Sequence, residues 1–368
     1  MTNINRWRHW IPCAVTLVLV ILVLTGCSSQ RIVDHNYILT VLGLDKSDTG
    51  YKETGLYSDY NLGGRTMLLQ GKAAKPSLLM DELNNQSSLP VMITKLKLLI
   101  INKQLAEEGL APFIESICRD PLISHYLIVA VSDGSTSTML QSLKDVKSES
   151  LPYHTVEQNI HSGQIPDSNL HNLLYDYYGE GRDPSVPYLK LNPNGKIEIT
   201  GHAILKDDRL KLTIQREEIL LYKILQGHLV RGNVPFAITK GQNEGTAVFN
   251  SLSGKKSRML SKSSLGSKIT YNLTLNGMVK DYPKWIKLKK SGDVELLTLQ
   301  LEKQLRSKLL ALLDKFVQNK VDPLGIGDFV RAHHRKDWQE QRFYEVEYPS
   351  LVFDVHVKIH LIKSGIVE

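Results

Sequence analysis

The hydrophobic pattern is most regular towards the C-terminus, where apolar residues recur at steps of three and four. These residues are Val294, Leu297, Leu301, Leu305, Leu309, Leu312 and Phe316. Their spacing predicts a long amphipathic helix of about seven turns. Upstream, the apolar residues of 269–275 alternate with polar ones, which predicts a strand with one solvated face. Residues 351–361 form another strand-like run. The helical stripe could lie on a membrane surface, but packing against the flanking sheet is the preferred interpretation.

Short apolar runs alternate with helical patterns in residues 37–131. Strands are predicted at 37–44, 51–62, 95–101 and 126–131, and helices at 77–86 and 106–117, the second broken at 109–112. The run from Lys95 to Ile101 begins by alternating and ends as continuous apolar sequence, which is typical of a strand entering the centre of a sheet. This order predicts a layered α/β domain.

The middle of the chain is less regular. Residues 133–188 are interrupted by Pro and Gly, and we interpret 179–187 as a boundary because Gly179-Glu180-Gly181 lacks the strand and helix that flank a phosphate loop. A hairpin is then predicted at 197–214, followed by a helix at 216–226 that stops at Gly227.

The predicted fold class is α+β, with three mixed α/β domains after the first 26 residues. The limits are an N-terminal α/β domain at 27–182, a middle hairpin–helix domain at 183–250, and a C-terminal α+β domain with the long helix at 251–368.

The N-terminus has the pattern of an export signal. Arg6 and Arg8 precede an apolar run from Ile11 to Leu24, which is shorter than the roughly 20 residues of a membrane-spanning helix. The run ends in Leu24-Thr25-Gly26-Cys27, which resembles the lipobox of bacterial lipoproteins. That resemblance implies a signal peptide at 1–26 and a lipid on Cys27. The alternative is an ordinary secreted protein whose signal ends near a cysteine.

The composition is that of a globular protein, with 23% charged and 42% hydrophobic residues. The net charge of +7 is spread along the chain, so it favours an anionic membrane surface weakly and does not indicate nucleic-acid binding. Once Cys13 and Cys27 are assigned to the signal and the lipid, Cys118 has no partner for an intramolecular disulfide. Its apolar helical surroundings predict a buried position.

The sequence contains no constellation typical of a catalytic, cofactor or metal site. Asp207 and Asp208 could bind a cation or act in acid–base chemistry, but in a tight polar turn they favour the turn geometry. His333 and His334 are adjacent, so on a helix their side chains diverge by about 100° and cannot chelate one metal together. A Gly-x-Ser-x-Gly nucleophile motif is also absent from the sequence. We therefore predict that the protein is not an enzyme.

Several motifs taken together resemble one family, the C subunits of bacterial spore germinant receptors, or Ger(x)C lipoproteins. In chain order they are the lipobox, Gly43-x-Asp45, Ala106-Glu107-Glu108-Gly109, Arg119-Asp120, the hairpin from Gly201 to Leu212 with Glu217-Glu218 behind it, and Gln318 to Gly327. Two positions depart from the family, which often carries Trp soon after the lipid cysteine and again beyond the position of Trp338. This chain has Gln30-Arg31 and Phe343-Tyr344 there.

The resemblance implies a lipoprotein on the outer face of the spore inner membrane that works with two integral-membrane subunits, of the A and B types. Such receptors answer small nutrients such as amino acids or sugars. We predict a partner-facing surface around Asp322 to Trp338, with exposed charges such as Arg331, Arg335 and Lys336. The alternatives are a transporter-associated solute-binding lipoprotein, which would require two α/β lobes with a cleft, and a surface hydrolase.

Overall fold

The computed structural model describes residues 35–59, 63–147, 151–227, 231–263, 266–333, 336 and 338–362. Contacts divide the chain into two units, Met1–Asn36 and Tyr37–Glu368, and the strands and helices named here belong to the second. The predicted signal peptide, Cys27, His334 and Arg335 lie outside the described residues.

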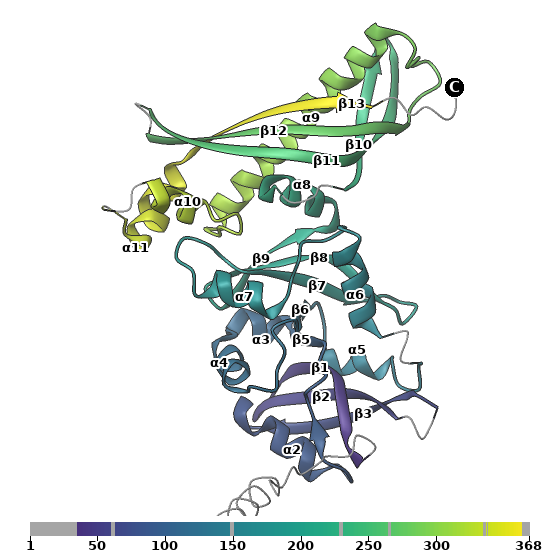
Figure 1. Cartoon of the computed structure of the whole chain (residues 1–368), viewed down its shortest axis with the longest axis vertical. Helices are drawn as coiled ribbons and strands as arrows, with labels where there is room; N and C mark the ends of the chain where they lie inside the picture. The colour runs from purple at the N-terminus through teal and green to yellow at the C-terminus, as the bar shows by residue number, and fades with distance from the viewer. Residues whose placement is uncertain are drawn as a thin grey trace, which may run out of the picture. The chain divides into compact units, whose positions relative to one another are not determined.

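A nine-stranded sheet forms the first part of the second unit (Figure 1). Its strand order is β3-β2-β1-β5-β6-β7-β8-β9, and β4 pairs with β1 beside this path. The central pairs β1–β5, β5–β6 and β6–β7 are parallel, whereas both edges are antiparallel. The strands are β1 (Tyr37–Ser47), β2 (Gly50–Asp59), β3 (Arg65–Ala73), β4 (Val91–Met92), β5 (Leu98–Asn102), β6 (Ile128–Ser132), β7 (Ser185–Leu191), β8 (Ile197–Lys206) and β9 (Arg209–Gln215).

Helices cover both faces of this sheet, as the continuous run of buried residues along β5 requires. Leu99 and Ile101 join a core with Phe113 of α4, whereas Leu98 and Ile100 join a second core with Met139 of α5. A strand with apolar side chains on both faces is typical of the centre of an α/β sheet. The helices are α2 (Leu79–Asn85, after a turn at Pro76–Leu78), α3 (Lys103–Glu108), α4 (Ala111–Arg119), α5 (Thr136–Gln141), α6 (Pro152–His161), α7 (Leu170–Tyr177) and α8 (Arg216–Gln226).

The second sheet has four strands in the order β10-β11-β12-β13. The predicted long helix is α9, and its leucine stripe packs against Ile269, Tyr271, Leu273 and Leu275 of β12 in one core. α9 also satisfies the backbone of the edge strand β10, because the Gln300 and Gln304 amides bond to Thr239 and Ala237 at 2.7–3.0 Å. The elements are β10 (Gly232–Lys240), β11 (Asn243–Ser263), β12 (Gly266–Asp281), α9 (Ser291–Gln318), α10 (Ile326–His333), α11 (Glu340–Arg342), further helical turns at Phe343–Glu347 and Tyr348–Ser350, and β13 (Val352–Leu361), which runs parallel to β12.

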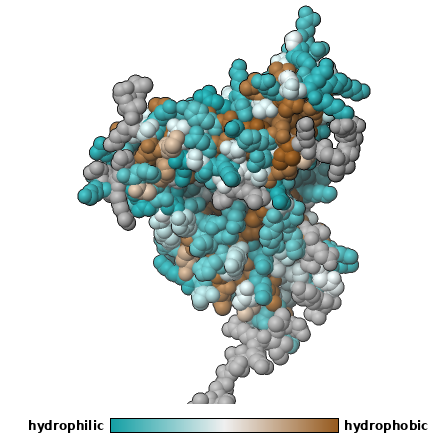
Figure 2. Space-filling view, turned by 45° about the horizontal axis from the view of Figure 1, so that its top comes forward, coloured by the Kyte–Doolittle hydropathy of each residue, from teal (hydrophilic) through white to brown (hydrophobic). Residues whose placement is uncertain are grey.

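The mixed α+β class predicted from the sequence is confirmed, with two sheets and flanking helices. Figure 2 shows mostly hydrophilic side chains on one face, with a hydrophobic area over the part that carries the second sheet and α9. Among the described residues, no helix is long and apolar enough to cross a membrane.

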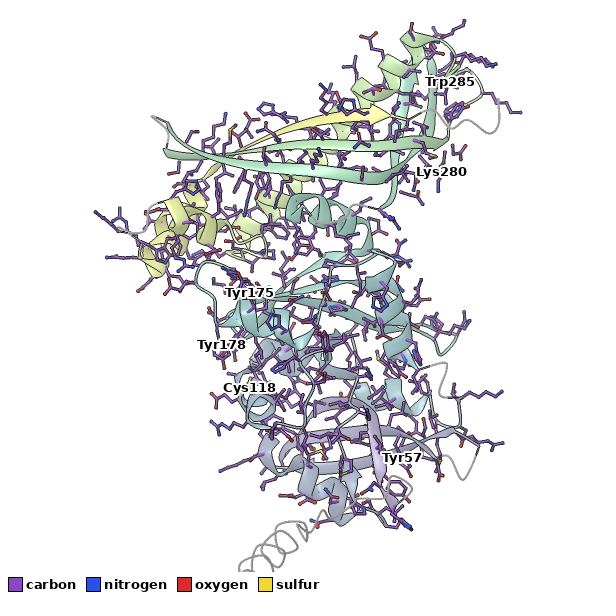
Figure 3. The ribbon with its side chains drawn as sticks, in the orientation of Figure 1. Tyr57, Cys118, Tyr175, Tyr178, Lys280 and Trp285 are labelled. Atoms are coloured by element: carbon purple, nitrogen blue, oxygen red, sulfur yellow. The ribbon has the colours of Figure 1, made fainter. Side chains whose placement is uncertain are left out.

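Two local expectations were wrong, and one stretch without a predicted element is a strand. Part of the predicted boundary at 179–187 belongs to β7, which pairs with both β6 and β8. The polar stretch that begins at Ser251 continues β11 and pairs with β12. Cys118 is exposed on α4 (Figure 3), because α4 directs Phe113 and Ile114 into the core and turns the position of Cys118 outwards.

Candidate functional site

Two loops far apart in the sequence meet through Asp183 and Asp322. The Asp183 N–H donates to the Asp322 carbonyl at 2.9 Å, and the Asp322 N–H donates to Asp183 Oδ2 at 2.5 Å. Both side chains are buried. We refer to these residues, with Glu180, Gly181, Arg182, Lys206, Gly327, Asp328 and Tyr344, as the Asp183–Asp322 junction. It joins the loop that leads into β7 to the start of α10.

The two buried carboxylates of the junction, Asp183 and Asp322, have different partners. Asp322 accepts hydrogen bonds from the N–H groups of Ile326 at 2.9 Å and Gly327 at 2.7 Å, so it satisfies the first donors of α10. Asp183 accepts from Lys206 Nζ of β8 at 3.1 Å. The same ammonium lies 3.4 Å from the ring centre of Tyr344, an arrangement in which the ring quadrupole also stabilises the charge.

Burial controls the protonation of the pair. It raises the pKa of Asp183 to about 6 and that of Asp322 to about 7, and repulsion between the two carboxylates adds to the effect at Asp322. Lys206 and the backbone donors oppose this rise. The junction therefore changes its charge just below neutral pH, where it links the first sheet to the C-terminal segment.

Close backbone packing holds the same junction together. Gly181 has φ +74°, and a Cβ added there would lie 2.3 Å from the Asp328 nitrogen. A Cβ on Gly327 would lie 2.8 Å from the Gly181 Cα. The Gly181 N–H donates to Glu340 at 2.8 Å, and its carbonyl accepts from the Asp328 N–H at 2.9 Å. Only glycine fits at both positions.

An outer layer of charges surrounds this packing. Asp328 pairs with Arg182 at 2.6 Å and with Arg331 at 2.7 Å, and the Trp338 indole N–H donates to Glu180 at 3.0 Å. The Arg182 guanidinium also stacks over the ring of Tyr175, which Figure 3 labels on α7, at 4.3 Å from its centre.

The predicted partner-facing surface at Asp322 to Trp338 is therefore revised. Asp322 is buried, and Arg331 is paired within the chain. Lys336 is exposed, and Arg335 lies outside the described residues. The sequence signal for this junction is the pair of glycine-containing segments at 179–181 and 325–327, and the sequence alone does not indicate that the two segments pack together.

The other candidate residues have structural roles. Asp207 has φ +55° in the β8–β9 turn, and Asp208 accepts from the Ala111 N–H at 3.0 Å, so the turn interpretation agrees with the structure. His333 Nδ1 lies 2.8 Å from the Phe329 carbonyl. Across the described part of the chain, no three metal-ligating side chains are grouped together.

Two motifs behind the family resemblance also have a clear physical basis. Asp45 accepts from the N–H groups of Thr136 and Ser137, each at 2.8 Å, and so caps α5. A Cβ on Gly43 would lie 2.6 Å from Thr136 Oγ1, so Gly43 makes room for this contact. Glu218 closes a capping box at the start of α8 and pairs with Lys315 of α9 at 2.8 Å.

Comparison with known proteins supports one family along almost the whole chain. Residues 29–191 match the family model for the spore germination protein N-terminal domain, and residues 200–365 match the model for spore germination B3/GerAC-like proteins, C-terminal. The chain belongs to the family of germinant receptor C subunits.

Two relatives are similar to this chain over all or most of their own length. Spore germination protein GerQC of Bacillus cereus is 22% identical over 99% of this chain and 100% of its own. Putative spore germination protein YfkR of Bacillus subtilis (strain 168) is 22% identical over 89% of this chain and 91% of its own. The crystal structure of the GerBC protein has the same fold, with a TM-score of 0.56 and 16% identity over 86% of this chain and 96% of that one.

The two family models meet between residues 191 and 200, within the first sheet. The predicted limit at 182/183 lies in the loop that leads into β7 of the first sheet, and the limit at 250/251 lies within β11 of the second. The three-domain division remains a prediction about folding units.

Proposed function

We propose that this protein is the lipid-anchored C subunit of a nutrient germinant receptor. Its lipid on Cys27 holds it on the outer face of the spore inner membrane, where it acts by contact with the A- and B-type integral-membrane subunits and not by catalysis. The observation that carries this proposal is the match of both family models, over residues 29–191 and 200–365.

Membrane confinement explains how such a subunit can act through weak contacts. A single acyl chain gives only marginal binding, so stable anchoring requires at least two. Once both partners are in the membrane plane, their effective concentration is high, and individually weak contacts can support a stable assembly.

The solute-binding alternative is less well supported. It predicts two similar α/β lobes, whereas the two sheets here have nine and four strands in unrelated orders. The family match favours the receptor subunit.

Lipidation is tested by labelling sporulating cells with radioactive palmitate. The wild type should incorporate label and fractionate with the membrane, and Cys27→Ala should do neither. Cys118→Ala is the matched control, because Cys118 is an exposed free thiol on α4 and its loss should leave labelling intact. Equal labelling of Cys27→Ala and the wild type would refute the anchor.

The receptor role is tested by deletion of the gene and by co-purification. Deletion, with paralogues also removed, should abolish germination in response to at least one nutrient. Tagged protein should recover the two membrane subunits from solubilised spore membranes. Intact responses to every nutrient in the deletion strain would reject the germination role itself.

A further inference from the structure

Glu53 of β2 is an acid buried in an apolar region. Its side chain is 0% exposed, and neither carboxyl oxygen has a hydrogen-bond partner among the described residues. In the sheet it stands between Leu44 of β1 and Gly71 of β3. A buried polar group without a partner destabilises the fold, so its presence calls for an explanation.

The carboxyl group faces a small cavity. The cavity has a volume of about 90 Å³ and lies between the sheet and helices α2 and α4. Figure 3 labels Tyr57 on β2 and Cys118 on α4, two of the elements that supply its wall. Gly71 helps to place the acid, because a Cβ there would lie 3.1 Å from Glu53 Oε1. Half-buried Met80 and Ile117 are part of the wall, so the cavity reaches the surface between α2 and α4.

The wall has a simple chemical character. Of the described residues that line the cavity, the polar ones are Glu53, Ser116 and Asp120, and the others are apolar, among them Leu79, Leu99 and Phe113. Its ionisable residues are both acids, and no described Lys, Arg or His lines it. Asp120 holds its own loop by accepting from the Leu122 N–H at 2.9 Å.

This chemistry excludes several ligand classes. A carboxylate or phosphate would meet two acids and no cation. A sugar would place hydroxyl groups against an apolar wall and leave them unpaired, which costs free energy. A cavity volume of about 90 Å³ limits the ligand to a few non-hydrogen atoms.

We propose that this cavity binds a small primary amine with a short alkyl group, the nitrogen at the Glu53 carboxyl group and the alkyl group against the apolar wall. The nitrogen supplies the donors that Glu53 lacks. Burial, with the nearby Glu82, raises the pKa of Glu53 to about 8, and a bound ammonium would lower that pKa again. The proposal concerns a ligand of this subunit itself and goes beyond its role as a membrane partner.

The test uses the full-length protein in lipid nanodiscs, with n-butylamine as the probe. Saturation-transfer NMR should show binding of butylamine, with a Kd of roughly millimolar strength for so few atoms. Butyrate, which has the same alkyl chain length but an anionic head, should bind at least tenfold more weakly. Empty nanodiscs give the background from partition into lipid.

Variants locate the binding. Glu53→Gln keeps the shape of the side chain and should weaken butylamine binding at least tenfold. Glu82→Gln is the matched control, since it removes a nearby acid outside the cavity wall and should retain binding. If Glu53→Gln does not fold, Ile117→Phe narrows the cavity from its half-buried rim and should weaken binding by a similar factor.

A crystal structure in 10 mM butylamine gives the direct answer. Density for the amine at Glu53 supports the proposal. Water only in the cavity, equal binding by wild type and Glu53→Gln, or butyrate binding as tightly as butylamine would each overturn it. None of these outcomes bears on the lipid anchor or on the co-purification experiment. The proposed amine site and the proposed receptor role can therefore be rejected independently of each other.

Discussion

Gly181 and Gly327 pack directly against each other. A Cβ added to Gly327 would lie only 2.8 Å from the Gly181 Cα. One glycine belongs to the loop before β7 and the other to the first turn of α10. Their contact allows the backbone hydrogen bond from Asp328 to Gly181 and places Asp183 beside Asp322. The connection between the first sheet and the C-terminal segment therefore requires glycine at both positions, because a side chain at either one would overlap the opposite loop.

Gly181→Ala should destabilise the protein through both strain and overlap. The left-handed φ of +74° costs about 1 kcal/mol for alanine, and the overlap with Asp328 adds about 1–3 kcal/mol. Gly195→Ala is the matched control, since Gly195 has φ +73° but nothing within 4 Å of the added Cβ. Urea unfolding should show the larger loss at Gly181. Equal losses of unfolding free energy in Gly181→Ala and Gly195→Ala would mean that the loop around Gly181 shifts to make room for the Cβ without a further cost.

Much of the fold follows from local patterns. The leucine stripe of α9, the alternation in β12 and the break between α3 and α4 at Gly109 are each contained within one short segment. Gly109 has φ +135°, a backbone conformation outside the helical region that glycine adopts readily, so the helix break there has a local cause.

Other features depend on partners that the sequence does not place. The strand β7 contains Pro187 and follows a glycine-rich loop, and it becomes a strand because β6 and β8 lie on either side. The stretch of β11 from Ser251 is polar, and its strand character comes from pairing with β12. In the candidate site, burial of Asp322 depends on its contact with Asp183, which in turn pairs with Lys206, and both residues are distant from Asp322 in sequence.

The stability of the Asp183–Asp322 junction should depend on pH. An acid whose pKa is raised on folding stabilises the fold fully below its unfolded pKa of about 3.9, and this contribution is lost as the pH rises through the folded value. For Asp183 and Asp322 the folded values are about 6 and about 7, so the loss falls between about pH 4 and pH 7.

Asp322→Asn should remove much of this dependence, because the amide cannot ionise. Relative to the wild type, the variant should gain on the order of 2 kcal/mol in unfolding free energy between pH 5 and pH 8. Buried His202, whose pKa burial lowers to about 3, has an opposite dependence below about pH 6.5, but it is common to both proteins and cancels. Chemical denaturation across this range checks the result. Parallel curves of unfolding free energy against pH for the wild type and the variant would contradict the assignment of this dependence to Asp322.

Asp45 should contribute to the stability of the protein, because its side chain caps α5 from another element of the fold. Asp45→Ala leaves the N–H groups of Thr136 and Ser137 without their acceptor, and the expected cost is about 1–2 kcal/mol. Asp48→Ala is the control, because Asp48 is exposed in the adjacent turn and its loss should cost less than about 0.5 kcal/mol. Thermal unfolding of the two variants measures the difference, and similar melting temperatures would show that α5 does not depend on this cap.

Arg331 and Lys336 separate internal support from partner contact in the predicted surface. Arg331→Glu places a third acid beside Asp328 and Glu180, so it should lower the unfolding free energy, by about 1 kcal/mol because the arginine is part-exposed.

Lys336→Glu reverses an exposed charge and should leave stability within about 0.5 kcal/mol of the wild type. If this surface meets the membrane subunits, Lys336→Glu should nevertheless reduce their co-purification and slow nutrient-triggered germination, because a reversed charge at an interface repels the partner. Unchanged co-purification and germination with Lys336→Glu would place the contact elsewhere, and any loss with Arg331→Glu would then follow from the damaged junction.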